Sequence, residues 1–185
     1  KRLAHLQEQI KEMEERASVV QGHLEEQRLR ALSDPLTGLP NRAAYDECIA
    51  EQRVKSVDNN TPLTLVVADL DRFKQVNDGF GHLAGDKVLR LVAKILRGGL
   101  RDSDVICRYG GEEFVLMLPK TTHDKGQMIA QRLRKTVSGQ FIFVDEIEIK
   151  QTVSIGLAAF PKDGETLDVL IEQADNALYA AKRAG

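Results

Sequence analysis

The chain has 185 residues, enough for one ordinary domain with an appended segment. A hydrophobic content of 42% supports a packed core and excludes global disorder. The formal net charge of −2 gives no overall attraction to nucleic acid or to anionic membranes, so we expect neither as a partner.

The two cysteines, Cys48 and Cys107, are far apart in the sequence and indicate neither a disulfide framework nor a zinc site. A reducing, cytoplasmic location fits this composition. No apolar run reaches the roughly 18–20 residues that a membrane span needs, so we expect no membrane contact by this chain. Because it begins at Lys1, we expect the chain to be part of a longer protein with a sensor or membrane segment upstream.

An apolar heptad repeat runs through residues 1–32. One repeat position holds Leu3, Ile10, Ala17, Leu24 and Ala31, and the other holds Leu6, Met13, Val20 and Gln27. This 3-4 spacing among charged residues predicts a coiled-coil helix that forms a homodimer. The alternative is one amphipathic helix packed on its own domain, but the narrow apolar stripe favours the coiled coil. Asp34-Pro35 ends the helix, which divides the chain into residues 1–33 and 34–185.

The remaining residues alternate between helical and strand patterns. Helices are predicted from Asn41 to about Lys55 and over residues 85–96, 125–137 and 167–182. Strands are predicted over residues 63–68, 141–144, 146–150 and 152–159, with a glycine-rich loop over residues 77–82. This order predicts an α+β fold in which helices flank a mainly antiparallel sheet.

The stretch Arg108-Tyr109-Gly110-Gly111-Glu112-Glu113-Phe114 joins two apolar runs. It predicts a β-hairpin in which Gly-Gly supplies the positive φ of a two-residue turn. Glycine lets phosphate approach the backbone, and carboxylate oxygens bind Mg²⁺. If the strand over residues 63–68 pairs beside this hairpin, Asp69 at its end converges with Glu112.

This stretch resembles the signature of the GGDEF family of diguanylate cyclases, in its Gly-Gly-Glu-Glu-Phe variant. The resemblance extends from about Asp34 to the C-terminus. Asp69–Lys74 matches the family's D-x-D-x-F-K segment, and Asp34–Arg42 matches its D-x-L-T-x-L-x-N-R segment, for which we expect a structural role. The family implies a palm-like, ferredoxin-related core.

The resemblance also implies an activity and a metal. Two GTP molecules would be joined into cyclic di-GMP with release of two pyrophosphates, each 3′-hydroxyl attacking the other α-phosphate across a two-domain dimer. Asp69, the Leu70 carbonyl and Glu112 would hold two Mg²⁺ or Mn²⁺ ions per site. Glu113 matches the residue that helps to deprotonate the 3′-hydroxyl, or else binds metal.

Substrate contacts follow from the same resemblance. The GTP phosphates would meet Gly110, Gly111, the backbone at Phe73, and the ammonium groups of Lys74 and Lys182. Asn77 and Asp86 match the pair that reads guanine, since a carboxylate can accept from guanine N1–H and N2–H₂. Taken alone, Asn77 also fits a turn, Asp86 a helix N-terminal charge, and Lys182 a solvated charge. The family usually has an arginine shortly after that lysine, and this chain stops at Gly185.

A product-inhibition site is also implied. Arg101 and Asp104 match the family's RxxD site for cyclic di-GMP, and Arg132 matches a second arginine that some members add. Arginine binds phosphate and stacks on guanine, although a bare RxxD also fits an exposed turn.

Three other functions compete with the cyclase. A catalytically silent sensor of GTP or cyclic di-GMP would carry decayed motifs, whereas the acids and Lys74 are intact here. A cyclase with an adenine or mixed product is opposed by Asp86. A structural dimerisation module would leave the placement of acids and glycines unexplained.

Overall fold

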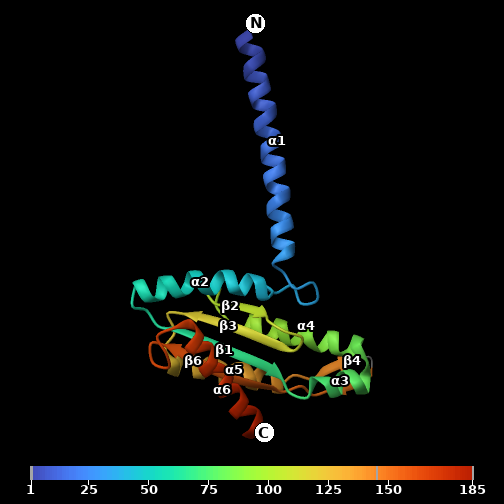
Figure 1. Cartoon of the computed structure of the whole chain (residues 1–185). Helices are drawn as coiled ribbons and strands as arrows, with labels where there is room; N and C mark the ends of the chain where they lie inside the picture. The colour runs from blue at the N-terminus through green and yellow to red at the C-terminus, as the bar shows by residue number, and fades with distance from the viewer. Residues whose placement is uncertain (1, 145, 185) are drawn as a thin grey trace. The chain divides into compact units, whose positions relative to one another are not determined.

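A computed structural model describes residues 2–144 and 146–184 (Figure 1). It contains two compact units, residues 1–33 and 34–185, and each is described by itself. The first unit is a single helix, α1 (Arg2–Ala31). No helix of the described residues is long and apolar enough to cross a membrane.

The apolar stripe of α1 is open to solvent. Ile10, Met13, Val20 and Leu24, all assigned to the heptad seam, are exposed. The side chains of Leu3 and Leu6, assigned to the same seam, lie outside those that the structure describes. Elsewhere on the helix, charged pairs four residues apart, such as Glu12 with Arg16 and Glu26 with Arg30, add modest local stability.

The second unit is built on a four-stranded antiparallel sheet in the order β2-β3-β1-β6. Its strands are β1 (Leu63–Leu70), β2 (Val105–Arg108), β3 (Glu113–Pro119) and β6 (Val153–Phe160). A helical crossover joins β1 to β2, and β3 returns between them, which is the split βαβ arrangement of ferredoxin-like folds. The predicted α+β class and ferredoxin-like core are therefore confirmed.

Helices cover both faces of this sheet. They are α2 (Arg42–Asp58), α3 (Phe73–Phe80), α4 (His82–Gly98), α5 (His123–Ser138) and α6 (Leu167–Ala184). Two short strands, β4 (Ile142–Val144) and β5 (Ile147–Ile149), form a separate hairpin beside α3 (Figure 1). The strands predicted over residues 141–144 and 146–150 thus form, over shorter spans, a ribbon outside the main sheet.

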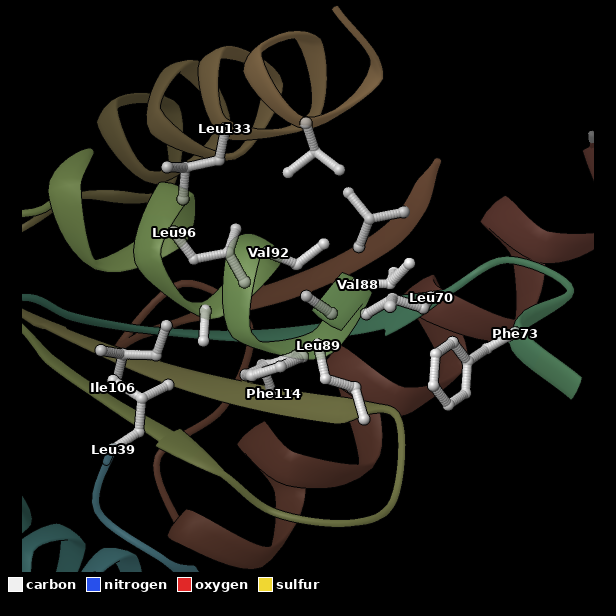
Figure 2. Close-up of a cluster of buried hydrophobic side chains, with 14 of the residues drawn as sticks. Leu39, Leu70, Phe73, Val88, Leu89, Val92, Leu96, Ile106, Phe114 and Leu133 are labelled. Carbon is white, nitrogen blue, oxygen red and sulfur yellow. The ribbon is translucent and has the colours of Figure 1, made fainter. Parts of the chain in front are cut away.

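The central strand β1 is buried along its whole length because both of its faces are covered. Val66, Ala68 and Leu70 pack in one core with α3, α4 and α5. Leu65 and Val67 pack in the other core, with α2 and α6. Figure 2 shows the first core, where Leu70 and Phe114 from the sheet meet Val88, Val92 and Leu96 of α4 and Leu133 of α5.

Helix α6 lies very close to β6. A Cβ on Gly156 would sit 2.2 Å from the backbone oxygen of Ala174 and 2.2 Å from the nitrogen of Leu178. Glycine is therefore required for this approach. The close contact holds α6 against the sheet at Ala174 and Leu178, one turn before Lys182.

The prediction of a glycine-rich loop over residues 77–82 is wrong. Those residues continue α3 to Phe80, and α4 begins at His82, three residues before the predicted start. The break is confined to Gly81, whose φ of 83° is a left-handed value that glycine tolerates. Phe73 and Val76 are buried on one face of α3, so packing overrides the low helix propensity of Gly79.

The turn expected at Gly110-Gly111 is also wrong, although the hairpin is present. Strand β2 ends at Arg108 and β3 begins at Glu113, so the connection has four residues rather than two. Among the described residues, the glycines with positive φ are Gly38 and Gly81. A longer loop built on ordinary turn geometry needs no positive φ at its glycines.

Candidate active site

Three charged side chains meet at the C-terminal end of β1. Asp69 is nearly buried, and its Oδ1 lies 2.8 Å from the Nζ of Lys182 at the end of α6. Glu112, in the hairpin loop, is near enough to Asp69 for the two carboxylates to repel each other. The sequence predicted that Asp69 and Glu112 converge, and the antiparallel pairing of β1 with β3 produces this convergence.

The backbone contributes an oxygen at the same place. The N–H of Leu70 donates to the carbonyl of Glu112 at 3.2 Å, which joins the end of β1 to the hairpin loop. In a strand, the C=O of a residue points to the same edge as its N–H, so the Leu70 carbonyl is directed toward that loop. Two carboxylates and one carbonyl are hard oxygen donors of the kind that Mg²⁺ and Mn²⁺ accept.

These donors fit a cation whose remaining ligands come from substrate or water. Within residues 2–144 and 146–184, no group of three or more His, Cys, Asp or Glu side chains is placed to hold a metal ion. A cation at this site would therefore depend on the Leu70 carbonyl and on phosphate oxygens, as Mg²⁺ sites beside phosphates commonly do.

Burial and the neighbouring charges change the pKa of Glu112. Burial, the carboxylate of Asp69 and the carboxylate of Glu113 raise the pKa of Glu112 above its ordinary value, whereas Lys182 acts in the opposite direction. The acids are thus held close together at an electrostatic cost that a cation would relieve.

A cavity of about 790 Å³ opens in front of these groups. Its walls include Asp69, Leu70, Glu112 and Lys182, so four predicted residues share one space. Other predicted residues lie outside its walls. The side chain of Phe73 is buried in the core, which leaves only its backbone at the first turn of α3 for a substrate. Lys74 is exposed on the same helix.

Glu113 lies directly opposite Asp69 in the sheet but lines a smaller cavity of about 110 Å³ with Tyr109 and Asp175. Its carboxylate folds back over the loop, because a Cβ on Gly110 would lie 2.7 Å from Glu113 Oε2. Gly110 therefore provides room for this side chain. A Cβ on Gly111 would meet nothing within 4 Å.

Asn77 lies on α3 where that helix packs against α4, which carries Asp86. The Oδ1 of Asn77 would lie 2.0 Å from a Cβ on Gly85, the residue before Asp86, so the small glycine leaves room for the Asn77 side chain as it lies here. Both side chains are partly exposed. An amide and a carboxylate side by side can offer hydrogen bonds to the edge of a base.

A second cavity, of about 740 Å³, contains all three residues predicted for the inhibitory site, Arg101, Asp104 and Arg132. Asp104 is buried, and its Oδ2 accepts the backbone N–H of Arg101 at 2.9 Å, while its Oδ1 has no partner. Arg132 donates to the carbonyl of Gly99 at 2.6 Å. Arg101 remains exposed at the rim.

Sequence reasoning assigned no role to Arg108, which supports the hairpin loop. Its guanidinium donates to the carbonyl of Gly111 at 2.7 Å and to both oxygens of Asp34 at 3.1 Å. Burial raises the pKa of Asp34, but hydrogen bonds from Thr37 and Arg108 outweigh this effect and lower the pKa below its ordinary value. Arg108 stands two residues before Gly-Gly and Asp34 opens the D-x-L-T-x-L-x-N-R segment, but no pattern in the sequence indicated that the two residues pair.

Two further residues were missed beside the cavity. The carboxylate of Asp71 accepts hydrogen bonds from the hydroxyl groups of Ser154 in β6 and of Thr152 just before it. The side chain of Gln151 donates to the backbone carbonyl of Asp71. The D-x-D spacing gave a signal for Asp71, but no pattern in the sequence marked Gln151.

The fold and the site place the chain in the class of palm-type nucleotide-binding domains, with acids at the end of the central strand beside a glycine-rich loop. The family model described as "Diguanylate cyclase, GGDEF domain" matches residues 31–185. The chain therefore belongs to the GGDEF family, and the resemblance noted in the sequence is confirmed.

Individual relatives agree with this assignment. The chain is 46% identical over its whole length to the diguanylate cyclase DgcP of Pseudomonas aeruginosa, of which it spans 27%. The solved coiled coil and GGDEF domain of DgcB from Caulobacter crescentus, in complex with c-di-GMP, superposes with a TM-score of 0.87 at 30% identity, covering 97% of this chain and 95% of that one. The active GGEEF domain of a diguanylate cyclase from Vibrio cholerae gives a TM-score of 0.68 at 28% identity, covering 73% and 85%.

Replacing Lys182 tests the electrostatics of the site. Lys182→Met removes the cation that lowers the Glu112 pKa, so we expect this pKa to rise further, as measured by carboxyl ¹³C NMR titration. With a raised folded-state pKa, the folded chain holds the proton more tightly than the unfolded chain. The Glu112 contribution to stability therefore falls as pH rises from the unfolded pKa through the folded one.

Lys150→Met is the matched control, because Lys150 lines the same cavity but does not contribute to the Glu112 shift. It should leave the titration of Glu112 unchanged. An unchanged Glu112 pKa in Lys182→Met would show that the ammonium does not act on this carboxyl.

Proposed function

We propose that this chain is a diguanylate cyclase, which condenses two GTP molecules into cyclic di-GMP and two pyrophosphates. The observation that carries the proposal is the convergence of Asp69, Glu112 and Lys182 in one cavity at the end of β1. Membership of the GGDEF family and 46% identity to a diguanylate cyclase support the same reaction.

Asp69, Glu112 and the Leu70 carbonyl would hold one or two Mg²⁺ or Mn²⁺ ions. A bound cation would neutralise phosphate charge and favour ionisation of the attacking hydroxyl. Lys182 remains close to Asp69 and would face the phosphates with its other N–H donors. Much of the rate would then come from positioning and electrostatics rather than from covalent chemistry.

The loop and α3 supply the remaining phosphate contacts. Gly111 has open space at its Cα, which would let a phosphate approach the loop, whereas the N–H of Gly110 already donates to the Glu113 carbonyl at 3.3 Å and a phosphate there would have to compete for it. The first-turn N–H groups at Phe73 and Lys74 face outward from the start of α3. The Lys74 ammonium adds a mobile positive charge. Glu113 folds beside Gly110, from where it would accept the proton of the 3′-hydroxyl or complete the metal site.

Guanine recognition is assigned to Asn77 and Asp86, which lie at the contact of α3 and α4. A carboxylate that accepts two N–H groups discriminates guanine from adenine, because adenine has no such pair of donors on that edge. The DgcB structure in complex with c-di-GMP supports a guanine ligand for this fold.

The exposed seam of α1 would pair with the same seam of a second copy. Each catalytic unit holds one GTP, and the reaction joins two, so two units must meet at the moment of chemistry. A coiled coil raises the local concentration of the second unit, and its geometry would control the rate.

Product formation tests the central proposal. The chain incubated with GTP and Mg²⁺ should release cyclic di-GMP, identified by mass spectrometry. Asp69→Asn and Glu112→Gln should lower the rate by at least about 100-fold, because each removes a charged metal ligand. Glu165→Gln changes an exposed carboxylate outside the cavity and should leave the rate unchanged. GTP binding without turnover by the unaltered chain would instead support a silent sensor.

The role of the stalk is tested by polar substitutions in its seam. Met13→Gln combined with Val20→Gln should dissociate the dimer, measured by analytical ultracentrifugation, and lower activity at low protein concentration. Val19→Gln alters an equally exposed residue outside the seam and should change neither. Full activity of the double variant in dilute solution would contradict control by the stalk.

Feedback inhibition predicts a specific loss. Arg101→Ala should weaken inhibition by cyclic di-GMP by about tenfold or more, since it removes a charged hydrogen-bond donor at the rim. Initial rates measured with added product provide the comparison. Arg134→Ala, an exposed arginine on α5 outside this cavity, should retain full inhibition. Equal inhibition of both variants would place the product elsewhere.

A further inference from the structure

The two aspartates of the Asp69-Leu70-Asp71 segment have different surroundings. Asp69 faces Lys182 in the cavity. The carboxylate of Asp71 is bound instead by two hydroxyl groups. Thr152 Oγ1 donates to its Oδ2 at 2.6 Å, and Ser154 Oγ donates to its Oδ1 at 2.6 Å. Each oxygen of Asp71 therefore accepts one hydrogen bond from the protein, and the side chain is tied to the start of β6.

The backbone of Asp71 is tied to the same segment. Its N–H donates to the Thr152 carbonyl at 3.0 Å. Gln151 Nε2 donates to the carbonyls of Asp71 and Thr152, each at 2.8 Å. Because both neighbours are carbonyl acceptors, the amide nitrogen of Gln151 must face them, and the orientation of the amide is determined by its partners.

Glutamine at position 151 is unfavourable for the stability of the fold. It is only 2% exposed, and its Oε1 has no hydrogen-bond partner. A buried polar atom without a partner destabilises the fold, so packing alone does not favour glutamine here. What the residue contributes is the pair of bonds that its Nε2 donates to the carbonyls of Asp71 and Thr152.

The position of Asp71 in the chain shows what the two hydrogen bonds from Gln151 support. It lies between Leu70, whose carbonyl is directed toward Glu112, and Arg72, which has a left-handed φ of 54° at the N-cap of α3. That conformation is unfavourable for arginine and needs support from neighbouring structure. Hydrogen bonds that hold Asp71 in place restrain the residues on both sides of it. They therefore determine the orientation of the Leu70 carbonyl and of the first N–H groups of α3.

We propose that Asp71 and Gln151 are positioning residues: together with Thr152 and Ser154 they brace the turn between β1 and α3, and Asp71 is not a metal ligand. The inference rests on the proposed function, because the turn matters through the cation and phosphates it would present. It assigns separate roles to the two acids of one motif, a ligand at Asp69 and a brace at Asp71.

Asparagine substitutions separate these roles. An asparagine at position 71 can still accept from one hydroxyl and donate to the other, since hydroxyls serve in both directions. It cannot replace the charge of a metal ligand. Asp71→Asn should therefore preserve the hydrogen bonds to the two hydroxyl groups, which Asp71→Ala removes. Asp69→Asn should lose the charged metal ligand.

The first measurement is the affinity for Mn²⁺ in the presence of GTP, followed by electron paramagnetic resonance. Asp71→Asn should bind Mn²⁺ within about threefold of the unaltered chain. Asp71→Ala should bind about tenfold more weakly, in the range known for residues that orient ligands, as should Asp69→Asn. Equal weakening by Asp71→Asn and Asp69→Asn would overturn the proposal by making Asp71 a ligand.

The second measurement needs no metal or nucleotide. Amide hydrogen exchange at Asp71 should be at least about tenfold faster in Gln151→Leu, because loss of the bond to its carbonyl loosens the brace. Gln127→Leu, at an exposed glutamine on α5, is the matched control and should not change it. Unchanged exchange at Asp71 in Gln151→Leu would overturn the brace. If the unaltered chain binds no Mn²⁺, the proposed function fails, and the exchange comparison decides the brace alone.

Discussion

The antiparallel pairing of β1 with β3 is the constraint on which the site depends. It places Asp69 opposite Glu113 and ends with the bond from the Leu70 N–H to the Glu112 carbonyl. A slip of one residue would turn Asp69 to the opposite face of the sheet, away from Lys182. Such a slip would also exchange the residues of β1 between two different cores, so the burial of both faces protects the geometry of the acids.

This rigid frame holds together charges that repel one another. Asp69, Glu112 and Glu113 lie at the ends of two paired strands, with Lys182 as the cation paired to Asp69. The repulsion appears in the raised pKa of Glu112. A flexible loop would separate such acids, whereas a loop bound to β1 and to Arg108 cannot do so without breaking hydrogen bonds. The core thus sustains a local arrangement that is unfavourable without a cation, as functional sites often require.

Much of the fold could be predicted from the sequence because local patterns decide it. The apolar run before Asp69 indicated a buried strand, and the apolar periodicity of residues 85–96 indicated a helix. The glycines misled: Gly79 lies within α3, and Gly110-Gly111 forms part of a four-residue loop without positive φ. For Gly79, the burial of Phe73 and Val76 outweighs its low helix propensity, and burial depends on contacts between distant segments. For Gly110 and Gly111, the loop is long enough to turn without a positive φ.

The site shows the same division between local motifs and distant contacts. The resemblance of the motifs to a known family predicted Asp69, Glu112 and Lys182 as site residues, and these three line one cavity. Contacts between distant segments were not visible in any motif. Gln151 lies 80 residues from Asp71, and Arg108 lies 74 residues from Asp34. Neither contact has a local pattern, because a single hydrogen bond between segments leaves no periodicity in the sequence.

Those two distant contacts support opposite sides of the same site. Arg108 holds the Gly111 carbonyl of the hairpin loop while binding Asp34, the first residue of the second unit. On the other side, the segment before β6 holds Asp71 at the exit of β1. One guanidinium shared by two acceptors cannot follow a displacement of Asp34 without straining its bond to Gly111. The loop that carries Glu112 is therefore joined by hydrogen bonds to the segment that follows the stalk in the chain, whereas the turn at Asp71 is held by the start of β6 and the residues just before it.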